Sequence, residues 1–221
     1  MTQLPREAIA AMRKSYGEAG LPDSALLEDP IDLFHHWLSE AAKNDFIIEP
    51  NAMVLTTVGE QGPTTRSVLV KDVTAEGFTF FTNYGSRKAK AIAFNPQVSL
   101  LFPWYSMERQ VSILGKAEKV SAAESDAYFA SRPWGSQIGA WASTQSDQMG
   151  SREELEARYK EFSAKYPEGT TVPRPDYWGG FLVRPTTIEF WQGRYSRLHD
   201  RAIYERATPQ EINWSRRRLF P

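Results

Sequence analysis

From residue 52 onward the chain is a succession of short segments with β-strand composition, and this pattern limits the possible folds more than any other feature. Turn signals such as Glu60-Gln61-Gly62 separate the runs AMVLTTV, TTRSVLVK, GFTFFTN, QVSLLFPW and ERQVSILGKAEKV. Strands return in WGGFLVRP, TIEFWQG and HDRAIYER. We therefore expect a mainly β, α+β protein with an antiparallel sheet, closed as a six-stranded barrel with helices outside it.

Helical signals stand before and between these runs. The first forty-odd residues are expected to be helical, and Asp29-Pro30 marks the start of one helix. Ser86 is expected to cap a short helix over residues 87–94, and Ser121 and Ser151 each open a capping box. No repeat or long linker divides the 221 residues, so we expect one domain.

Composition excludes several classes of protein. The chain has no cysteine and only three histidines, so disulfides, thiolate nucleophiles and iron–sulfur clusters are ruled out and a catalytic metal is not expected. The net charge of −1 argues against a nucleic-acid partner, and no apolar run is long enough for a membrane span. The beginning of the chain lacks a secretory pattern, so we expect a cytoplasmic protein. Redox chemistry would need a bound organic cofactor.

Basic residues occur at the start of the helix predicted after Ser86. Arg87 and Lys88 would face the positive end of the helix dipole, which is unfavourable unless an anion is bound there. Taken alone, a solvated surface turn explains them more simply.

A second unusual segment is the run TTRSVLVK. Strand alternation places Arg66 and Lys71 on opposite faces, which is typical of an edge strand and also of a strand beside a phosphate cleft.

A third group of polar residues fits either an anionic ligand or a surface helix. Tyr128 and Arg132 lie four residues apart at the end of a predicted helix, and Gly135-Ser136 is expected to turn the chain beyond it, so all three side chains could meet one phosphate. An amphipathic surface helix is the alternative.

In an extended strand Arg197, His199 and Arg201 would share one face, and three basic groups in a row need an anion or an electron-rich ring beside them. The preceding Phe190-Trp191-Gln192 could stack on a flat cofactor or belong to the core. The chain has no GxGxxG, GxxxxGK[ST] or GxSxG motif, so side chains would do most of any phosphate binding.

Several longer segments together resemble the pyridoxine/pyridoxamine 5'-phosphate oxidase family, from about Arg13 to Pro221. They are RSVLVK (66–71), FFTNYGSRKA (80–89), NPQVSLLFPW (95–104), ERQV (108–111), YFASRPWGSQIGAW (128–141), QS (145–146), YWGGF (177–181), IEFWQG (188–193), RLHDR (197–201) and the closing RRLFP. The resemblance implies FMN-dependent oxidation of pyridoxine or pyridoxamine 5'-phosphate to pyridoxal 5'-phosphate in vitamin B6 metabolism. O2 would be the electron acceptor, and hydrogen peroxide, with ammonia from the amine, the by-product.

The resemblance also implies a split β-barrel homodimer with one non-covalent FMN per subunit, in clefts between the subunits. The single domain, 1–221, would comprise an N-terminal helical and mobile segment at 1–20, a helical segment at 21–50, and at 51–221 the barrel with inserted helices and C-terminal dimerisation strands.

Site residues follow from the same resemblance, position by position. The expected FMN contacts are Arg66, Ser67, Val68, Leu69, Val70, Lys71, Phe81, Thr82, Arg87, Lys88, Gln110, Gln145, Ser146, Trp191 and Arg201. The substrate phosphate would be bound by Lys71, Tyr128, Arg132 and Ser136, and the pyridine ring by Arg197, Leu198 and His199. Arg13, Lys14, Ser15 and Tyr16 match a segment that can close over the substrate. Arg197 and His199 are the expected catalytic residues.

Three positions depart from the family pattern, namely Ser15, Phe81 and Trp134. Phe81 lacks only a hydroxyl, and Trp134 bears on the packing of the phosphate pocket. Other interpretations are a related split-barrel flavin oxidoreductase with another substrate and a non-enzymatic carrier of pyridoxal phosphate. An RNA-binding module is disfavoured by the near-neutral charge.

Overall fold

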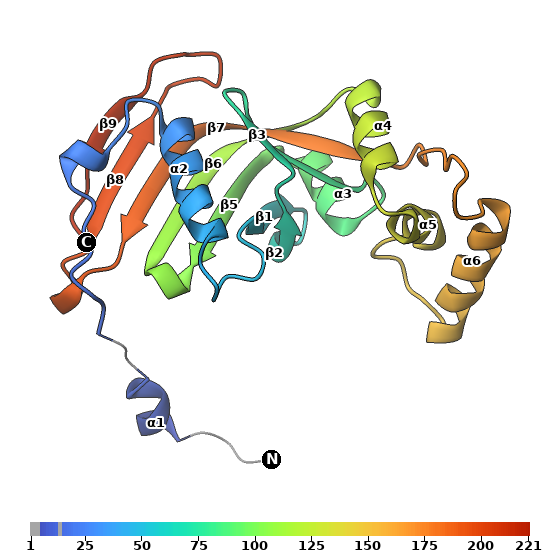
Figure 1. Cartoon of the computed structure of the whole chain (residues 1–221), viewed down its shortest axis with the longest axis horizontal. Helices are drawn as coiled ribbons and strands as arrows, with labels where there is room; N and C mark the ends of the chain where they lie inside the picture. The colour runs from blue at the N-terminus through green and yellow to red at the C-terminus, as the bar shows by residue number, and fades with distance from the viewer. Residues whose placement is uncertain (1–4, 13–14) are drawn as a thin grey trace.

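The computed structural model describes residues 5–12 and 15–221, and nine strands of this part form one antiparallel sheet (Figure 1). The strands are β1 (Ala52–Gly59), β2 (Gly62–Leu69), β3 (Asp72–Thr74), β4 (Gly77–Asn83), β5 (Gln97–Trp104), β6 (Arg109–Lys119), β7 (Trp178–Gln192), β8 (Asp200–Glu205) and β9 (Ser215–Arg218). The helices are α1 (Arg6–Ala10), α2 (Pro30–Ala42), α3 (Arg87–Phe94), α4 (Ala122–Ser131), α5 (Trp134–Ala142) and α6 (Arg152–Lys165), with short 3₁₀ turns η1 (Asp23–Ala25), η2 (Tyr105–Met107) and η3 (Tyr195–Arg197).

The long strand β7 organises the sheet. Along one edge it pairs with β6, and the order continues through β5 and β1 to β2. Along its other edge, residues 178–183 pair with β4 and residues 187–192 pair with β8. The two ends of β7 therefore lie in different surroundings, one beside β4 and the other beside β8.

The two strands predicted at 178–185 and 187–193 are one continuous strand. In the sequence, Pro185 suggests that a strand ends there. In the structure, the pairing of β6 with β7 has a bulge between Leu114 and Gly115, and this bulge accommodates Pro185 within β7. A Cβ atom on Gly115 would lie 2.5 Å from the carbonyl oxygen of Arg184, so the bulge requires glycine there. The runs predicted at 52–58, 77–83 and 97–104 are confirmed as β1, β4 and β5.

The predicted six-stranded barrel is not confirmed, because the pairings within the described chain leave the sheet open. β2 pairs only with β1, and the three-residue β3 pairs only with β4. The chain crosses from one edge to the other at Val70 and Lys71, whose N–H groups donate to the carbonyl oxygens of Asn51 and Thr79. Residues 70–71 are therefore hydrogen-bonded to other segments, and β2 and β3 do not pair with each other.

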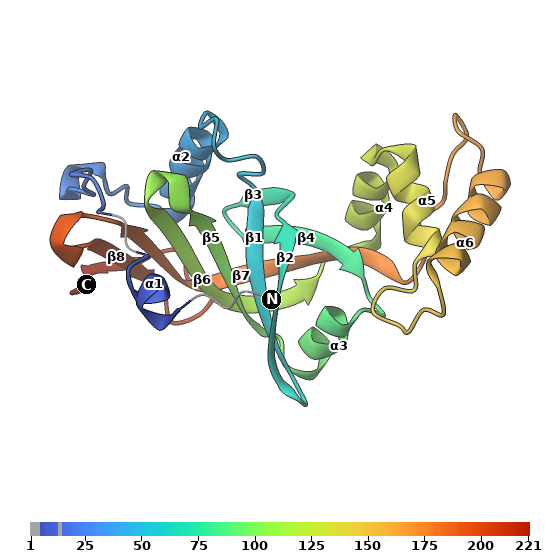
Figure 2. The ribbon, with the colours of Figure 1, turned by 90° about the horizontal axis from the view of Figure 1, so that it is seen from below.

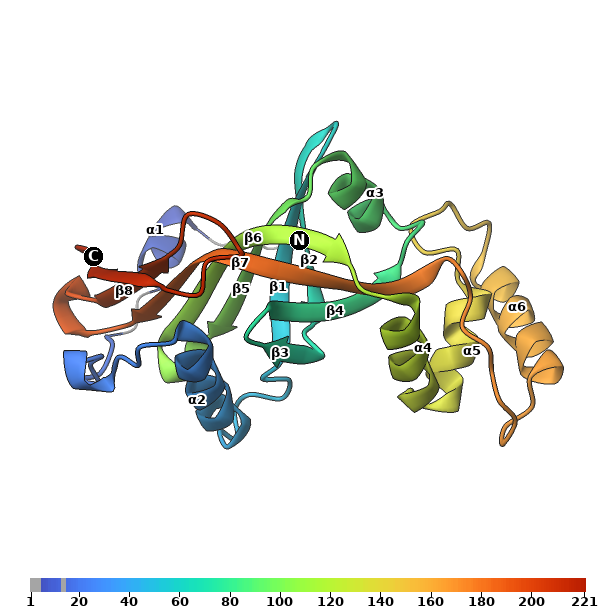
Figure 3. The ribbon, with the colours of Figure 1, turned by 90° about the horizontal axis from the view of Figure 1, so that it is seen from above.

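The main core lies between α2 and the sheet. The side chain of Asp29 accepts a hydrogen bond from Ile31 N–H, which confirms the predicted start of α2. Phe34 packs edge-on against Phe78 and Phe102, with ring centroids 4.9 and 4.8 Å apart. α3 lies on the other side of the strands from α2 (Figures 2 and 3).

A second apolar cluster joins α4, α5 and α6 to the start of β7. Phe129, Ile138, Val172 and Trp178 are buried in it. These helices gather at one end of the molecule, and β8, β9 and the C-terminus lie at the other (Figure 1). Because the cluster includes Trp178, the start of β7 connects the helical end to the sheet.

The N-terminal prediction is partly wrong. Of the first forty-odd residues only 6–10 and 30–42 are α-helical in the described chain, and residues 15–22 have no regular structure. Their N–H and C=O groups bond instead to distant parts of the chain, for example Leu21 N–H to Asp200. In the described ranges no helix is long and apolar enough to cross a membrane.

Candidate functional site

A hollow of about 480 Å³ opens where β2 and β4 face α4 and α5. Four cations line it, from four different parts of the chain, and none of its lining residues is acidic; we call it the cationic pocket. Its lining residues are Arg66, Ser67, Val68, Leu69, Lys71, Phe81, Thr82, Asn83, Lys88, Tyr128, Arg132, Ser136, Gly139, Ala140, Ser143, Gln145 and Trp178.

Within the described residues, the cations of the pocket have no carboxylate partners. Arg66, Lys71, Lys88 and Arg132 form no ion pair with any residue of the described chain. Burial, followed by the charge of Arg87, lowers the pKa of Arg66, and burial followed by the charge of Arg66 lowers the pKa of Lys88. A bound anion would relieve this uncompensated charge.

Arg66 and Lys71 reach the same pocket even though strand alternation places them on opposite faces. β2 ends at Leu69, so Lys71 lies in the crossing to β3 and is not bound by the alternation. Arg66 Nη1 donates to the carbonyl oxygen of Leu55 at 3.1 Å and to Thr57 Oγ1 at 2.9 Å. These bonds fix the guanidinium group at the pocket wall.

The start of α3 supplies the third cation. Ser86 is fully buried and its Oγ accepts from Ala89 N–H, as predicted. Lys88 Nζ donates to Thr82 Oγ1 at 3.1 Å and to Gln145 Oε1 at 2.8 Å. The predicted basic pair separates here, because Arg87 lines a different hollow of about 380 Å³ between α3 and the β1–β2 turn.

Arg132 lies over an aromatic stack. The ring of Phe81 stacks on Tyr128, with centroids 4.0 Å apart, and on Trp178 at 5.5 Å. The guanidinium carbon of Arg132 lies 4.7 Å from the centroid of Trp178, and Arg132 Nη1 is buried without a hydrogen-bond partner. Burial lowers the pKa of Arg132. A buried, unpartnered donor that lines a hollow is able to donate to an anionic ligand.

The chain beyond Arg132 differs from the prediction. Gly135-Ser136 does not form a turn, because α5 begins at Trp134, directly after Pro133. Gln137 Nε2 donates to the carbonyl oxygens of Phe129, Ala130 and Arg132 and so closes the end of α4. This cap holds Arg132 and Ser136 at the pocket from two adjoining helices.

A second hollow of about 480 Å³ lies beside η3, and we call it the histidine hollow. Its lining residues are Met12, Ser15, Tyr16, Arg194, Ser196, Arg197 and His199. The ring of His199 is 4.7 Å from Trp191 and 5.5 Å from Tyr16, between centroids. Burial, and secondly the charge of Arg197, lowers the pKa of His199, which favours the neutral imidazole.

The prediction that Arg197, His199 and Arg201 share one strand face is wrong. Residues 195–197 form a 3₁₀ turn, with Ser196 and Arg197 in left-handed backbone conformations at φ 54° and 62°, and β8 begins only at Asp200. Just before this turn, the N–H group of Gly193 donates a hydrogen bond to the carbonyl oxygen of Glu108. Alternation applies only to extended backbone, and here Arg197 and His199 line one hollow while Arg201 lines another.

Arg201 lines a third hollow, of about 290 Å³, which Gln110, Trp191 and Pro221 also line. Its Nε donates to Glu189 Oε1 at 2.7 Å, and this bond is the main reason that the pKa of Arg201 is raised. Unlike the cations of the cationic pocket, Arg201 already has a carboxylate partner.

The expected site residues therefore form two groups at opposite ends of β7. The cationic pocket lies at Trp178, and the other two hollows lie at or just beyond Trp191. At about 3.3 Å per residue the strand separates these positions by roughly 40 Å. One chain does not bring both groups around one small ligand.

Val70, Leu198 and Ser146 lie outside these hollows. The side chain of Val70 is buried in the main core, and Leu198 is 61% exposed. Ser146 accepts a hydrogen bond from Arg87 N–H at 3.2 Å. Arg13 and Lys14 lie outside the described residues.

Sequence reasoning missed some lining residues of both hollows. Asn83, Ser143 and Trp178 line the cationic pocket, and Arg194 lines the histidine hollow. Trp178 lies in the segment YWGGF, where a bulky aromatic residue next to two glycines could have indicated a site residue. Arg194 has no such signal in the sequence. No group of three or more His, Cys, Asp or Glu side chains in the described chain could hold a metal ion.

Comparison with protein families gives two matches. Residues 39–166 match the family described as pyridoxamine 5'-phosphate oxidase. Residues 178–221 match the pyridoxine 5'-phosphate oxidase C-terminal dimerisation region.

Individual proteins extend the similarity over the whole chain. The chain is 50% identical to pyridoxine/pyridoxamine 5'-phosphate oxidase of Rubrobacter xylanophilus, covering 100% of both chains. It is 53% identical to the protein of that name from Thermosynechococcus vestitus, over 96% of this chain and 99% of the relative. Among solved structures, PhzG from Burkholderia lata in complex with tetrahydrophenazine-1-carboxylic acid has a TM-score of 0.84 at 29% identity, covering 93% of this chain and 100% of that one.

Proposed function

Because the chain belongs to the pyridoxine/pyridoxamine 5'-phosphate oxidase family, a family of flavoprotein oxidoreductases of vitamin B6 metabolism, we propose that it makes pyridoxal 5'-phosphate. The substrate is pyridoxine 5'-phosphate or pyridoxamine 5'-phosphate. O2 is reduced to hydrogen peroxide, and the amine substrate also takes up water and releases ammonia.

The observation that carries the proposal is the unpartnered Nη1 of Arg132 in a pocket with four cations and no carboxylate. Such a pocket suits a dianionic phosphate, and each charge-assisted hydrogen bond contributes roughly 1.5–3 kcal/mol. We assign Lys71, Tyr128, Arg132 and Ser136 to the substrate phosphate. Their binding energy would hold the reacting carbon in place from a distance.

The same pocket fits FMN. Arg66, Thr82, Lys88 and Gln145 line one part of it, with two cations for a phosphate and amide and hydroxyl groups for polar edges, while Ser67 to Leu69 offer strand backbone. FMN, when bound, would accept hydride from the substrate and pass the electrons to O2. Gln110, Trp191 and Arg201 are the proposed contacts from the other end of β7.

Arg197 and His199 are the proposed catalytic residues. Arg197 lines the histidine hollow and would face the substrate ring with its charge. His199, whose pKa is lowered by burial and by the charge of Arg197, would orient the ring or relay a proton.

We further propose that the active site forms between two copies of the chain. The dimerisation region at 178–221 carries Trp191, Arg197, His199 and Arg201, and these residues are distant from the cationic pocket of their own chain. A two-fold dimer would place one chain's pocket against the other chain's histidine hollow, twice.

The test is a pair of measurements on the purified protein. We expect flavin absorbance in the visible spectrum, and peroxide release on adding pyridoxine 5'-phosphate but much less on adding unphosphorylated pyridoxine. A protein that takes up no FMN, or one indifferent to the phosphate, would refute the proposal. Peroxide release with a tricyclic carboxylic acid instead would favour a reaction nearer to the ligand seen in PhzG.

A further inference from the structure

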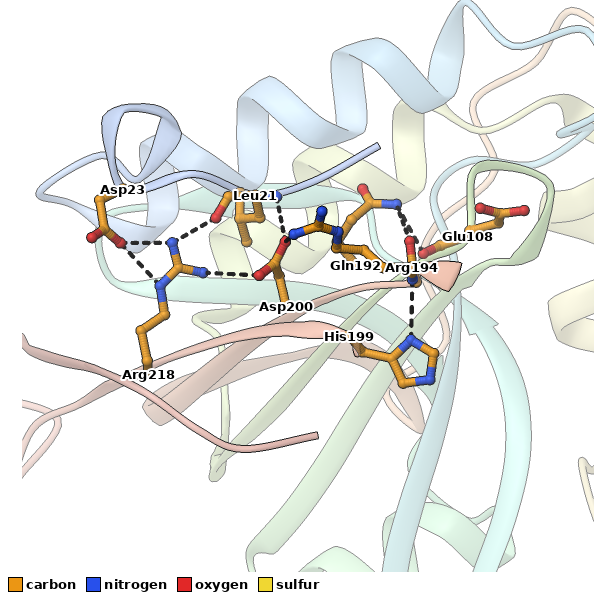
Figure 4. A network of polar contacts seen from close by, with 9 residues as sticks. Leu21, Asp23, Glu108, Gln192, Arg194, His199, Asp200 and Arg218 are labelled. Atoms are coloured by element: carbon orange, nitrogen blue, oxygen red, sulfur yellow. Dashed lines mark hydrogen bonds and ion pairs between the residues drawn. The ribbon is translucent and has the colours of Figure 1, made fainter. Parts of the chain in front are cut away.

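A polar network extends from His199 in the histidine hollow to the N-terminal segment, and apart from His199 its residues have no role in the proposed reaction. Arg194 connects the turn at η3 to the start of β8: its backbone N–H donates to His199 Nδ1 at 3.1 Å, and its Nη1 lies 3.5 Å from Asp200 Oδ2 (Figure 4). The hydrogen bond comes from the backbone of Arg194 and the ion pair from its side chain, so the ion pair with Asp200 helps to fix the backbone that donates to His199.

The direction of the first bond defines the imidazole. A backbone N–H can only donate, so Nδ1 of His199 must be the acceptor and must carry no proton. In a neutral imidazole the proton is then on Nε2, which becomes a hydrogen-bond donor. A protonated ring could not accept this bond, and a ring with the proton on Nδ1 would leave the Arg194 N–H unpaired.

Asp200 anchors the other end of the network. Its Oδ2 also accepts from Leu21 N–H at 2.9 Å, and its Oδ1 lies 3.9 Å from Arg218 Nη1 on β9. Arg218 in turn donates to Asp23 at 2.6 Å (Figure 4). The carboxylate thus connects the N-terminal segment, the turn at η3 and the C-terminal strand.

From these contacts we infer that Arg194 and Asp200 are positioning residues that hold His199 as a neutral imidazole with its proton on Nε2, which is presented as a donor. In this state Nε2 would donate a hydrogen bond to an oxygen or nitrogen of the substrate. For Nε2 to accept a proton, the ring proton would have to be on Nδ1, and the hydrogen bond from the Arg194 N–H to Nδ1 would be lost. This inference rests on the proposed function only in giving His199 a substrate to face.

The state of the ring is measurable without any reaction. The chain has three histidines, so ¹⁵N labelling of the imidazoles gives few signals, and His199→Asn identifies the one from His199. At pH 8 we expect this signal to show a bare Nδ1 and a protonated Nε2. A protonated Nδ1, or rapid averaging of the two tautomers, would overturn the inference whatever the activity of the protein.

Two variants test the positioning. In Arg194→Met and Asp200→Asn we expect averaging of the two tautomers and about a tenfold fall in kcat, with KM for the substrate changed less than about threefold. Arg217→Met on β9 is the matched control, because it removes an arginine–carboxylate pair, with Glu205, that does not touch the histidine hollow. A normal His199 signal with unchanged kcat in both variants would remove the positioning role. If the wild-type protein has no oxidase activity, the proposed function fails. The ¹⁵N signals would still show whether the His199 ring carries its proton on Nε2, as inferred, or not.

Discussion

At the scale of the residue, Arg132 combines a buried donor that has no hydrogen-bond partner with a place in the lining of the cationic pocket. Its Nη1 is buried without a partner, and its guanidinium group lies over Trp178. We predict that Arg132→Ala raises KM for the phosphorylated substrate about tenfold or more and lowers kcat less, because it removes a charged contact remote from the reacting carbon. Steady-state kinetics check this, with the exposed Arg152→Ala as control; an unchanged KM would exclude Arg132 from the phosphate site.

Arg197 gives a second kinetic prediction. If it faces the substrate ring, Arg197→Met should lower kcat/KM about tenfold or more, since a lost charge-assisted contact is worth at least ~1.4 kcal/mol. FMN content should stay normal. Near-wild-type turnover in the FMN-loaded variant would contradict the assignment.

The backbone beside Arg197 can be tested separately. Ser196 has φ 54° and ψ 18°, a left-handed conformation that a β-branched residue adopts only at a cost. We predict that Ser196→Val lowers the free energy of unfolding by about 1–2 kcal/mol, while Ser196→Gly, which also loses the hydroxyl, does not. Urea denaturation of the two variants compares them, and equal stability would show that the turn does not constrain Ser196.

At the scale of the element, helix starts and isolated strands could be predicted from the sequence because their signals are local. Asp29 and Ser86 are N-caps in the structure, and the run at 77–83 is β4. α5 was missed because Pro133 and Gly135 suggest a turn, whereas Gln137 caps the preceding helix through side-chain contacts invisible in a sequence pattern. The merging of two predicted strands in β7 likewise depends on a bulge in its partner β6.

The cap of α3 connects an element to the site. We predict that Ser86→Ala lowers the free energy of unfolding by about 1 kcal/mol and weakens FMN binding, because the cap fixes the helix start that carries Lys88. Thermal denaturation and FMN titration measure the two effects. Ser151→Ala, which removes the cap of α6 outside the cationic pocket, is the control and should leave FMN affinity unchanged. Equal FMN affinity in both variants would separate the cap from the cofactor site.

At the scale of the whole molecule, the resemblance predicted most residues of the cationic pocket, but residue patterns alone could not show how they meet. Arg66 and Lys71 converge only because β2 ends between them, and Arg87 and Lys88 diverge at one helix start. Alternation failed for Arg197 and His199 because a turn replaces the expected strand. Their separation from Arg132 along β7 is a property of the fold that no local pattern contains.

This separation leads to a test of the shared site. If each site takes Arg132 from one chain and Arg197 from the other, a mixed dimer of Arg132→Ala and Arg197→Met chains has one intact site and one doubly altered site. Random mixing in equal amounts makes half of the dimers mixed, so activity should recover to about a quarter of the wild-type value, although each variant alone is impaired. Co-expression with two different affinity tags, followed by isolation of the mixed dimer, would raise this to about half. Mixed dimers no more active than the average of the two parents would mean that each chain builds its site alone, and the roughly 40 Å along β7 would then have to be bridged within one subunit.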